Sequence, residues 1–498
     1  MVYGVIEIGC KEDVTCADGS PFSGTGEAIS IRSNLGLAVS AGCLHLAKHV
    51  RIDAEYSERP NAVLDRMVGF MRAAADKWSG VKLLAVRLCT KLERDDFCYE
   101  NDDDLRALCG AMAAVLPKVT RLNLCVRAPN FIIVAGKPYV LLASQYADQL
   151  EEMELNRPVR FPQDVVFRRL KKLHIDGAHE PRCRLPRMDP GVVEELRLDT
   201  LPPFEVWSAF DPDACAPEIT FNNLKALDLT YYECCADRFL DDGGYLPYDD
   251  DVDNYVKLPE HTWRLRFPAL KRLDMCSDAD GYQLLERSEL PPRMDAIAIQ
   301  ATSAVFRDAA SRTLPAVQRL IVNILPESNN DPAALPAACR ILSSAVASDD
   351  VVLMICDKKM TVAPSQINVD TLTRLSLYAP TSVDTMLDLI RKLPRLVTLT
   401  IWSLLLYDIQ ADINAPGPDE ASLLVPFNTR IRTLTLHAPL CEPLMGSFAL
   451  LVRYLILRIP TLKRLHSDRA KPPLFEAVVP AYRRQYPHLD SIRFDFKQ

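Results

Sequence analysis

The acidic run DDDVDNYVKLPE is the part of the sequence whose residue types and spacing come closest to a recognisable chemical site. Asp249, Asp251 and Asp253 occupy positions one, three and five of a calcium-binding EF-hand loop. Glu260 occupies position twelve, where such loops place a bidentate carboxylate. Position six, however, is Asn254 instead of the glycine that the sharp turn requires, and the preceding DDGGYLPY cannot form an entering helix. The sequence therefore favours a solvated acidic loop, with calcium binding as the alternative interpretation.

Other short patterns that are typical of enzymes fail at a defining residue. His45 and His49 have the spacing of a zinc protease, but Leu46 stands where that pattern needs a glutamate. The GTG that begins at Gly24 lacks the third glycine and the preceding strand of a dinucleotide site. No nucleophile-elbow, phosphate-loop or protein-kinase signature is present in the sequence. We therefore expect a protein that is not an enzyme and uses no cofactor. A hydrolytic or calcium-regulated protein that uses the acidic run is the alternative.

Net charge and hydropathy argue against several kinds of partner. The net charge of −8 gives no general attraction to nucleic acid or to anionic lipid. The most apolar stretch near the C-terminal end, residues 448–459, is interrupted by two arginines and is too short to span a bilayer. The first residues, MVYGVIEIGCKEDV, lack the basic start of a signal peptide, and the fifteen cysteines include no CxxC pair. We therefore expect a protein of the cytoplasm or nucleus, with reduced thiols, that binds neither nucleic acid nor membrane.

A basic cluster in the first half of the chain has two interpretations. It could form solvated edges of structural units, or it could form a pocket for an acidic or phosphorylated segment. Solvated edges are the simpler interpretation. The cluster consists of Arg168, Arg169, Lys171, Lys172, Arg182, Arg184 and Arg187.

One short pattern, L-x-x-L-x-L in outline, recurs along most of the chain. A single copy would indicate only a half-buried strand, but thirteen full copies indicate a repeat array. A weaker copy begins at Leu462, and VVLMIC at Val351 fills the widest gap between copies. The full copies begin at Val81, Val119, Leu150, Leu170, Val193, Leu224, Leu270, Met294, Val317, Leu372, Leu396, Ile431 and Leu489.

Strand and helix signals alternate along this array. Six copies follow a proline, which ends a helix as the chain turns into a strand, and Thr381-Ser382 ahead of VDTMLDLIRKL is typical of a helix N-cap. We therefore predict an α/β fold: an irregular leucine-rich-repeat-like solenoid, or horseshoe, with short parallel strands on the concave face and helices on the convex face. Residues 1–60 are assigned to an N-terminal cap region. Residues 61–498 are assigned to the solenoid, with an acidic insert at about 237–260.

Three units, VFRRLKKLHID, VVEELRLDTLPPFEVWSAF and LTRLSLYAPTSVDTMLDLIRKLPRLVTLTI, resemble a family of F-box and leucine-rich-repeat-like proteins of early-diverging fungi. The likeness covers most of the chain from about Arg32 onward. It implies a substrate-recognition or scaffold role in a ubiquitin ligase, in which an N-terminal F-box docks on the Skp1 adaptor of a cullin complex. Residues 1–40 contain no L-P-x-E-like helix start of an F-box. We therefore expect Skp1 and cullin as partners only if an F-box lies upstream.

The repeat register also predicts which side chains a protein partner would meet. Residues between and after the three apolar positions should point away from the core, onto the concave face. Tyr378 and Trp402 follow the third apolar position in neighbouring units, so their rings should touch and form an exposed aromatic platform, unless loops between the repeats cover them. The predicted partner-binding residues are Arg121, Glu152, Glu154, Lys172, His174, Asp176, Glu195, Arg197, Asp199, Arg272, Asp274, Arg374, Tyr378, Trp402 and His437.

Overall fold

The chain divides into two compact units, which are described separately. Unit 1 comprises residues 1–270 and 287–290, and unit 2 comprises residues 271–286 and 291–498. A computed structural model describes residues 5–12, 29–56, 60–72, 78–90, 102–127, 137–156, 161–162, 164–175, 185–198, 209–210, 218–230, 264–277, 288–301, 314–324, 350–355, 372–406, 426–427, 429–437, 445–467 and 492–496.

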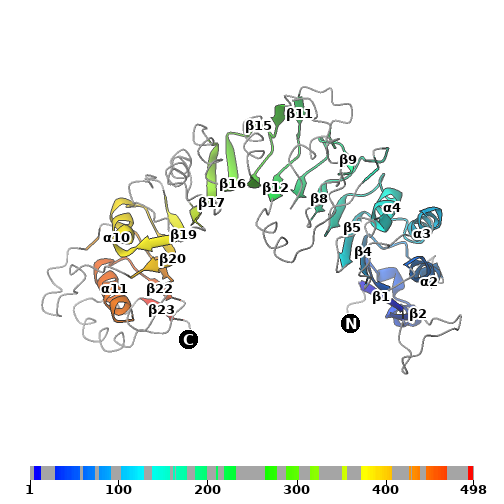
Figure 1. The fold of residues 1–498 in the computed structure, drawn as a ribbon, viewed down its shortest axis with the longest axis horizontal. Coiled ribbons are helices and arrows are strands. Elements are labelled where there is room, and N and C mark those ends of the chain that lie inside the picture. The colour runs from blue at the N-terminus through cyan, green and yellow to red at the C-terminus, as the bar shows by residue number, and fades with distance from the viewer. Residues whose placement is uncertain are drawn as a thin grey trace, which may run out of the picture. The chain divides into compact units, whose positions relative to one another are not determined.

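Unit 1 is built on one main sheet (Figure 1). Each strand is hydrogen-bonded to the next, and all pairings are parallel except that of β2 with β1, which is antiparallel. The parallel order follows the chain order, as repeated strand and crossover units require. The strands, in spatial order, are β2 (Ile29–Ser33), β1 (Val5–Glu12), β3 (His49–Tyr56), β4 (Leu83–Thr90), β5 (Arg121–Arg127), β6 (Glu152–Leu155), β8 (Lys172–Ile175), β10 (Glu195–Leu198) and β12 (Ala226–Thr230).

The apolar positions of the repeat form the core of unit 1, as the sequence pattern predicts. Leu122, Met153, Leu173, Leu196 and Leu227 are Cα partners across five adjacent strands, and each is at most 2% exposed. The next apolar position along each of these strands is also buried. This continuous apolar row fixes the register, because a slip by one residue would turn every row member to the opposite face.

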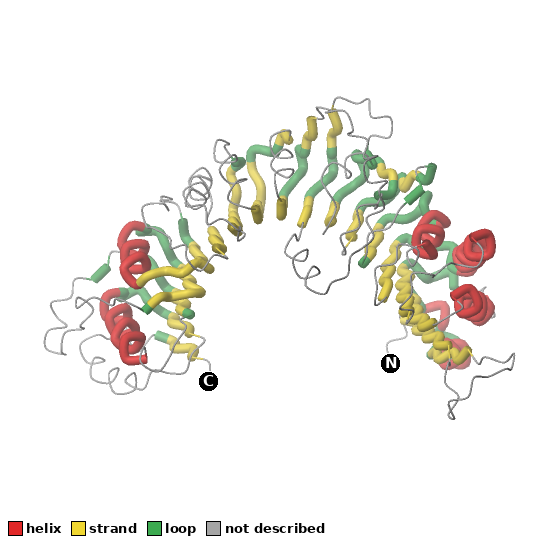
Figure 2. The backbone as a smooth tube through the Cα atoms, viewed as in Figure 1, coloured by secondary structure: helices red, strands yellow, loops and turns green. Residues whose placement is uncertain are grey.

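Helices in one part and short strands in another cover the side of this sheet that carries the buried row (Figure 2). Helices α2 (Pro60–Arg72), α3 (Asp102–Val115) and α4 (Lys137–Gln145) cover β3 to β5. The cap region, earlier in the sequence, contains the short helix α1 (Leu35–Ser40) and the 3-10 helix η1 (Leu44–Leu46). Two small parallel sheets lie farther along the chain. They consist of β7 (Val166–Phe167) with β9 (Arg187–Met188), and of β11 (Glu218–Thr220), β13 (Arg264–Arg266) and β15 (Ser288–Glu289).

The expectation of a helix after every strand is therefore wrong for the connection between β6 and β8, where β7 takes its place. Successive repeats begin only 20 residues apart here, at Leu150 and Leu170, which leaves room for a two-residue strand and its turns but not for a packed helix.

In the second small sheet, Arg266 of β13 pairs with Glu218 of β11 at 3.2 Å and with Glu289 of β15 at 2.9 Å.

Unit 2 repeats the same plan with a second run of parallel strands. Strand β18 contains Val351–Ile355 of the segment VVLMIC, which the repeat spacing predicted as a strand. Helices α10 (Val383–Lys392) and α11 (Met445–Arg458) pack apolar side chains against one side of the last strands (Figure 2). The strands, in order, are β14 (Arg272–Ser277), β16 (Arg293–Ala301), β17 (Ala316–Ile324), β18 (Asp350–Ile355), β19 (Arg374–Ser382), β20 (Thr398–Leu405), β21 (Thr433–Leu436), β22 (Arg464–Ser467) and β23 (Arg493–Phe496).

Helix α10 begins at the cap that the sequence predicts. The Oγ of Ser382 accepts a hydrogen bond from the backbone N–H of Thr385 at 3.1 Å, which satisfies one of the free donors of the first turn. Ser382→Ala should therefore lower the free energy of unfolding by about 1 kcal/mol. Ser382→Asp keeps an acceptor and should unfold like the wild type. Urea unfolding followed by circular dichroism measures both, and an unchanged alanine variant would contradict this role of the cap.

Candidate partner-binding face

The predicted partner-binding residues that the structure describes lie on one face of the main sheets. We call this face, whose side chains alternate with the buried row, the polar face. In unit 1 its first row holds Arg121 and the residues aligned with it from strand to strand, and in unit 2 it holds Arg374 and the residues aligned with it. The second row holds the residue two positions later in each strand. In unit 1 the rows include Arg121, Glu152, Lys172 and Glu195, then Asn123, Glu154, His174 and Arg197.

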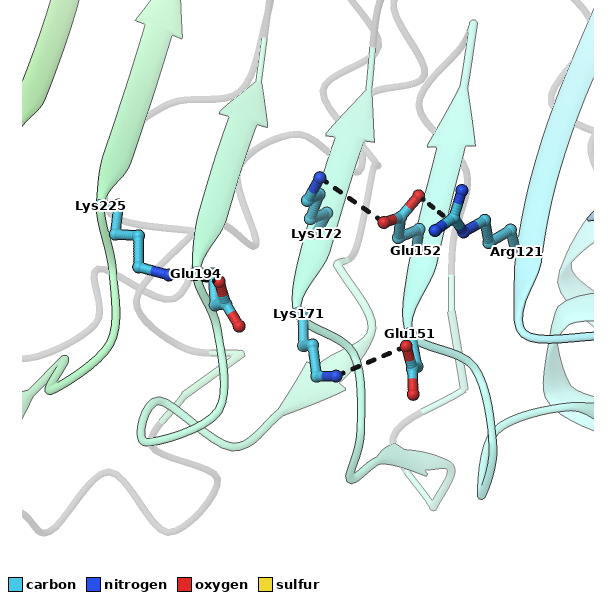
Figure 3. A network of polar contacts seen from close by, with 7 residues as sticks. All are labelled: Arg121, Glu151, Glu152, Lys171, Lys172, Glu194 and Lys225. Carbon is cyan, nitrogen blue, oxygen red and sulfur yellow. Dashed lines mark hydrogen bonds and ion pairs between the residues drawn. The ribbon is translucent and has the colours of Figure 1, made fainter.

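Charged side chains on the polar face of unit 1 form ion pairs with one another (Figure 3). Glu152 lies between two cations, with Arg121 Nε at 3.2 Å and Lys172 Nζ at 3.5 Å. In the second row, the amide of Asn123 donates to Glu154 at 2.6 Å, while His174 Nδ1 lies 3.9 Å from the same carboxylate. Arg197 likewise pairs at 3.5 Å with Asp228, its Cα partner in β12.

A further row lies at the strand starts, and we call it the rim row: it holds the residue immediately before each first-row position. In unit 1 acids and bases alternate along it, with Lys171 3.4 Å from Glu151 and Lys225 2.6 Å from Glu194 (Figure 3). The hydrogen bond from Lys225 lowers the pKa of Glu194. Because these pairs are largely exposed, each contributes at most about 1 kcal/mol. Their main effect is that Glu151 and Glu194 each have a cationic partner at the strand starts.

The polar face of unit 2 carries a stack of three aromatic rings. The ring centroids of Tyr378 and Trp402 lie 4.8 Å apart with 12° between the planes, and those of Trp402 and His437 lie 4.0 Å apart with 3° between the planes. These separations are close to the spacing of neighbouring strands, about 4.8 Å, so strand pairing itself sets the stack. The predicted contact between Tyr378 and Trp402 is confirmed.

The exposure of the stack differs along its length. Tyr378 is 37% exposed and Trp402 is 42% exposed, whereas His437 is only 7% exposed. The expectation that His437 offers itself to a partner therefore needs correction, because the indole of Trp402 covers its ring. His437 supports the platform from one side instead of forming part of its surface.

A β-bulge lies directly at the stack. The register between β19 and β20 shifts between Leu377 and Pro380, so that Tyr378 and Ala379 together oppose Trp402. Bulges redirect side chains and occur frequently beside functional sites. Here the extra residue lies beside the exposed rings of Tyr378 and Trp402, so the bulge contributes to the placement of Tyr378.

Hydroxyl groups continue the polar face beside the rings. Ser376, Thr400 and Thr435 are Cα partners in the second row of β19 to β21, and all three are partly exposed. His466 follows in β22, and its ring makes an edge contact with His437 at 6.1 Å between centroids. Sequence reasoning did not identify His466 as a site residue, although the weak copy LKRLHS would have placed it in this row.

The other predicted site residues fall into two groups. Glu195 and Arg374 are exposed in the first row, and Arg272 lies 4.0 Å from Asp274 within β14. The remaining predicted residues lie outside the described part of the chain: Asp176, Asp199, Asp249, Asp251, Asp253 and Glu260. The same holds for Arg182 and Arg184 of the basic cluster.

Two buried titratable groups, Cys109 and Tyr146, have shifted pKa values. Within the described ranges, no three His, Cys, Asp or Glu side chains come together as metal ligands. Burial raises the pKa of the Cys109 thiol to about 12, and it also raises the pKa of Tyr146. Both groups therefore stay protonated at neutral pH, and the thiol of Cys109 in α3 donates to the carbonyl of Pro138 in α4.

Comparisons with known proteins add no family to these observations. No family model matches the sequence, and no curated protein matches it. In the part of the chain that the structure describes, no helix combines the length and the apolar character needed to cross a bilayer.

Proposed function

We propose that this chain is a protein-binding, leucine-rich-repeat-like solenoid whose partner docks on the polar face of unit 2, at Tyr378 and Trp402. The observation that carries the proposal is the exposure of two large, stacked rings on adjacent strands. Tyrosine and tryptophan dominate binding energy in protein interfaces when a partner excludes water from them. The parallel sheet supports the horseshoe form that the repeats predict.

The rigidity of the rings supports the same function. Each ring is held by a neighbour, and Trp402 lies between Tyr378 and His437. Side chains that are already ordered lose little conformational entropy when a partner binds, so more of the contact energy remains as affinity. The hydroxyls of Thr400 and Thr435 beside the rings add the polar groups that commonly surround such an anchor.

The contrast between the units favours unit 2 as the docking site. In unit 1, Glu152, Glu154 and Asp228 already have cationic or amide partners on the sheet. A partner that contacted them would have to compete with these pairs. In its most specific form, the proposal makes the chain a substrate-recognition or scaffold protein of the F-box and ubiquitin-ligase type. This form rests on the resemblance of the repeat units.

Photo-crosslinking tests where a partner docks. We expect p-benzoylphenylalanine at Thr400, between Ser376 and Thr435 in the second row, to form a discrete covalent adduct with a protein in a cell extract. The same group at Asp384, exposed on α10, is the matched control in the same unit and should give no such adduct. Equal labelling from both positions, or from Asp384 alone, would contradict docking on the polar face.

A further inference from the structure

The rim row of unit 2 breaks the charge alternation seen in unit 1. Arg432 and Lys463 occupy the rim positions of β21 and β22, where unit 1 places an acid beside a base. They are immediate neighbours, because the backbone N–H of Lys463 donates to the carbonyl of Arg432 at 2.8 Å. Two cations thus occupy a position that pairs opposite charges elsewhere in the chain.

Two more cations stand at the same edge. Arg395 and Arg430 each lie three residues before the first-row position of their strand, in the adjacent repeats of β20 and β21. Both are exposed, as are Arg432 and Lys463. We call Arg395, Arg430, Arg432 and Lys463 the basic rim. In the described part of the chain, none of the four has an acidic partner.

Across the whole of unit 2, acidic and basic residues are nearly balanced in number, so the basic rim is a local concentration of positive charge. Like charges that face each other on adjacent strands lower stability. The sequence therefore keeps a locally unfavourable arrangement that an external anion would relieve. Helix C-terminal dipoles explain Arg391 and Lys392 at the end of α10, but they do not explain Arg432 and Lys463 at strand starts.

We propose that the basic rim binds an anionic segment, bearing carboxylates or phosphates, of the protein partner that docks on the aromatic stack. This inference rests on the proposed function. The two features lie on neighbouring repeats: the basic rim precedes β20 to β22, and the exposed rings of Tyr378 and Trp402 lie within β19 and β20. Four residues of strand, about 13 Å, separate the first row from the level of Trp402. An extended segment along the strands would therefore place acidic groups four or more residues from the residue that contacts the rings.

The overall charge of the chain selects among anionic partners. A long polyanion such as nucleic acid would gain from the basic rim but would be repelled by a chain whose net charge is −8. A short acidic segment of a protein places its charge at the rim alone. The basic rim thus fits a protein segment better than it fits a nucleic acid.

Fluorescence anisotropy with short anionic probes tests the site in the full chain. At low ionic strength we expect binding of a labelled octaglutamate peptide and of a phosphoserine peptide of equal charge, and their relative affinity separates carboxylate from phosphate recognition. Arg432→Glu combined with Lys463→Glu should weaken both at least about tenfold. Lys171→Glu combined with Lys225→Glu makes the same charge change in the rim row of unit 1 and should weaken them less than about twofold. Equal losses in both variants would overturn the proposal.

Three further measurements remove alternative explanations. Arg432→Glu alone should weaken peptide binding yet raise the melting temperature slightly, because it recreates with Lys463 the acid–base pair of unit 1. A lower melting temperature would show that Arg432 already pairs with an acidic residue of the chain, and would overturn the site.

An octauridine RNA that binds more tightly than octaglutamate, and whose binding is lost in the Arg432→Glu and Lys463→Glu double variant, would also overturn it. Tyr378→Ala with Trp402→Ala should leave octaglutamate binding intact, so failure of the rim and failure of the aromatic anchor are distinguishable.

Discussion

Replacing Leu173 with aspartate should lower the free energy of unfolding by about 4 kcal/mol or more. Leu173 lies in the middle of β8, is 1% exposed, and stands in the continuous row between Met153 and Leu196. The substitution removes the buried methyl groups of leucine and places a carboxylate among apolar side chains. The carboxylate must either remain charged without a partner or take up a proton, and both are unfavourable.

Two control variants separate this effect from a general loss of stability. Lys172→Asp introduces the same side chain one residue away, on the exposed polar face, and should cost no more than about 1 kcal/mol. Leu173→Met keeps the volume and apolar character and should cost less than about 1.5 kcal/mol. Urea unfolding monitored by circular dichroism measures all three. If Leu173→Asp and Lys172→Asp unfold at the same urea concentration, the buried row is placed on the wrong face.

The sequence predicted the strands and their inward faces because both depend on local alternation. Each L-x-x-L-x-L copy carries its own signal, and adjacent copies must align their leucines to bury them. For the same reason, the weak segment at Val351 could be recognised as a strand, and Ser382 could be recognised as a helix cap. A side chain next to a third apolar position, such as Trp402, could then be placed on the polar face without any knowledge of its neighbours.

The parts that could not be predicted depend on partners that are distant in the sequence. Strands β7 and β9 contain two residues each, too few for a periodic signal, and they form only because the neighbouring repeats bring them together. His437 is buried because the ring of Trp402, 35 residues earlier in the sequence, covers it. The residues next to His437 in the sequence do not indicate this burial. The repeat register aligns Arg121, Glu152 and Lys172 on adjacent strands, but it does not show which side-chain conformations bring their charged groups into contact.

Replacing Tyr378 and Trp402 together with alanine should weaken partner binding by about 2 kcal/mol or more, which is roughly thirtyfold. The change in stability should be smaller. Both side chains are more than a third exposed, so little burial is lost, and what remains is the stacking with each other and with His437. Such ring pairs contribute about 0.5–1.5 kcal/mol each. Affinity for the captured partner, measured by calorimetry, and urea unfolding give the two quantities independently.

Two variants define what the double substitution means. Trp402→Phe keeps an aromatic ring between Tyr378 and His437 and should recover most of the affinity. Leu37→Ala with Leu46→Ala removes exposed apolar surface from unit 1, where those side chains are 67% and 49% exposed, and should not change binding. If the Tyr378 and Trp402 double variant lost about 4 kcal/mol of stability, the rings would belong to the core. If its affinity changed less than twofold while its stability fell only slightly, the stack would serve only to align β19, β20 and β21, and the partner would have to dock elsewhere.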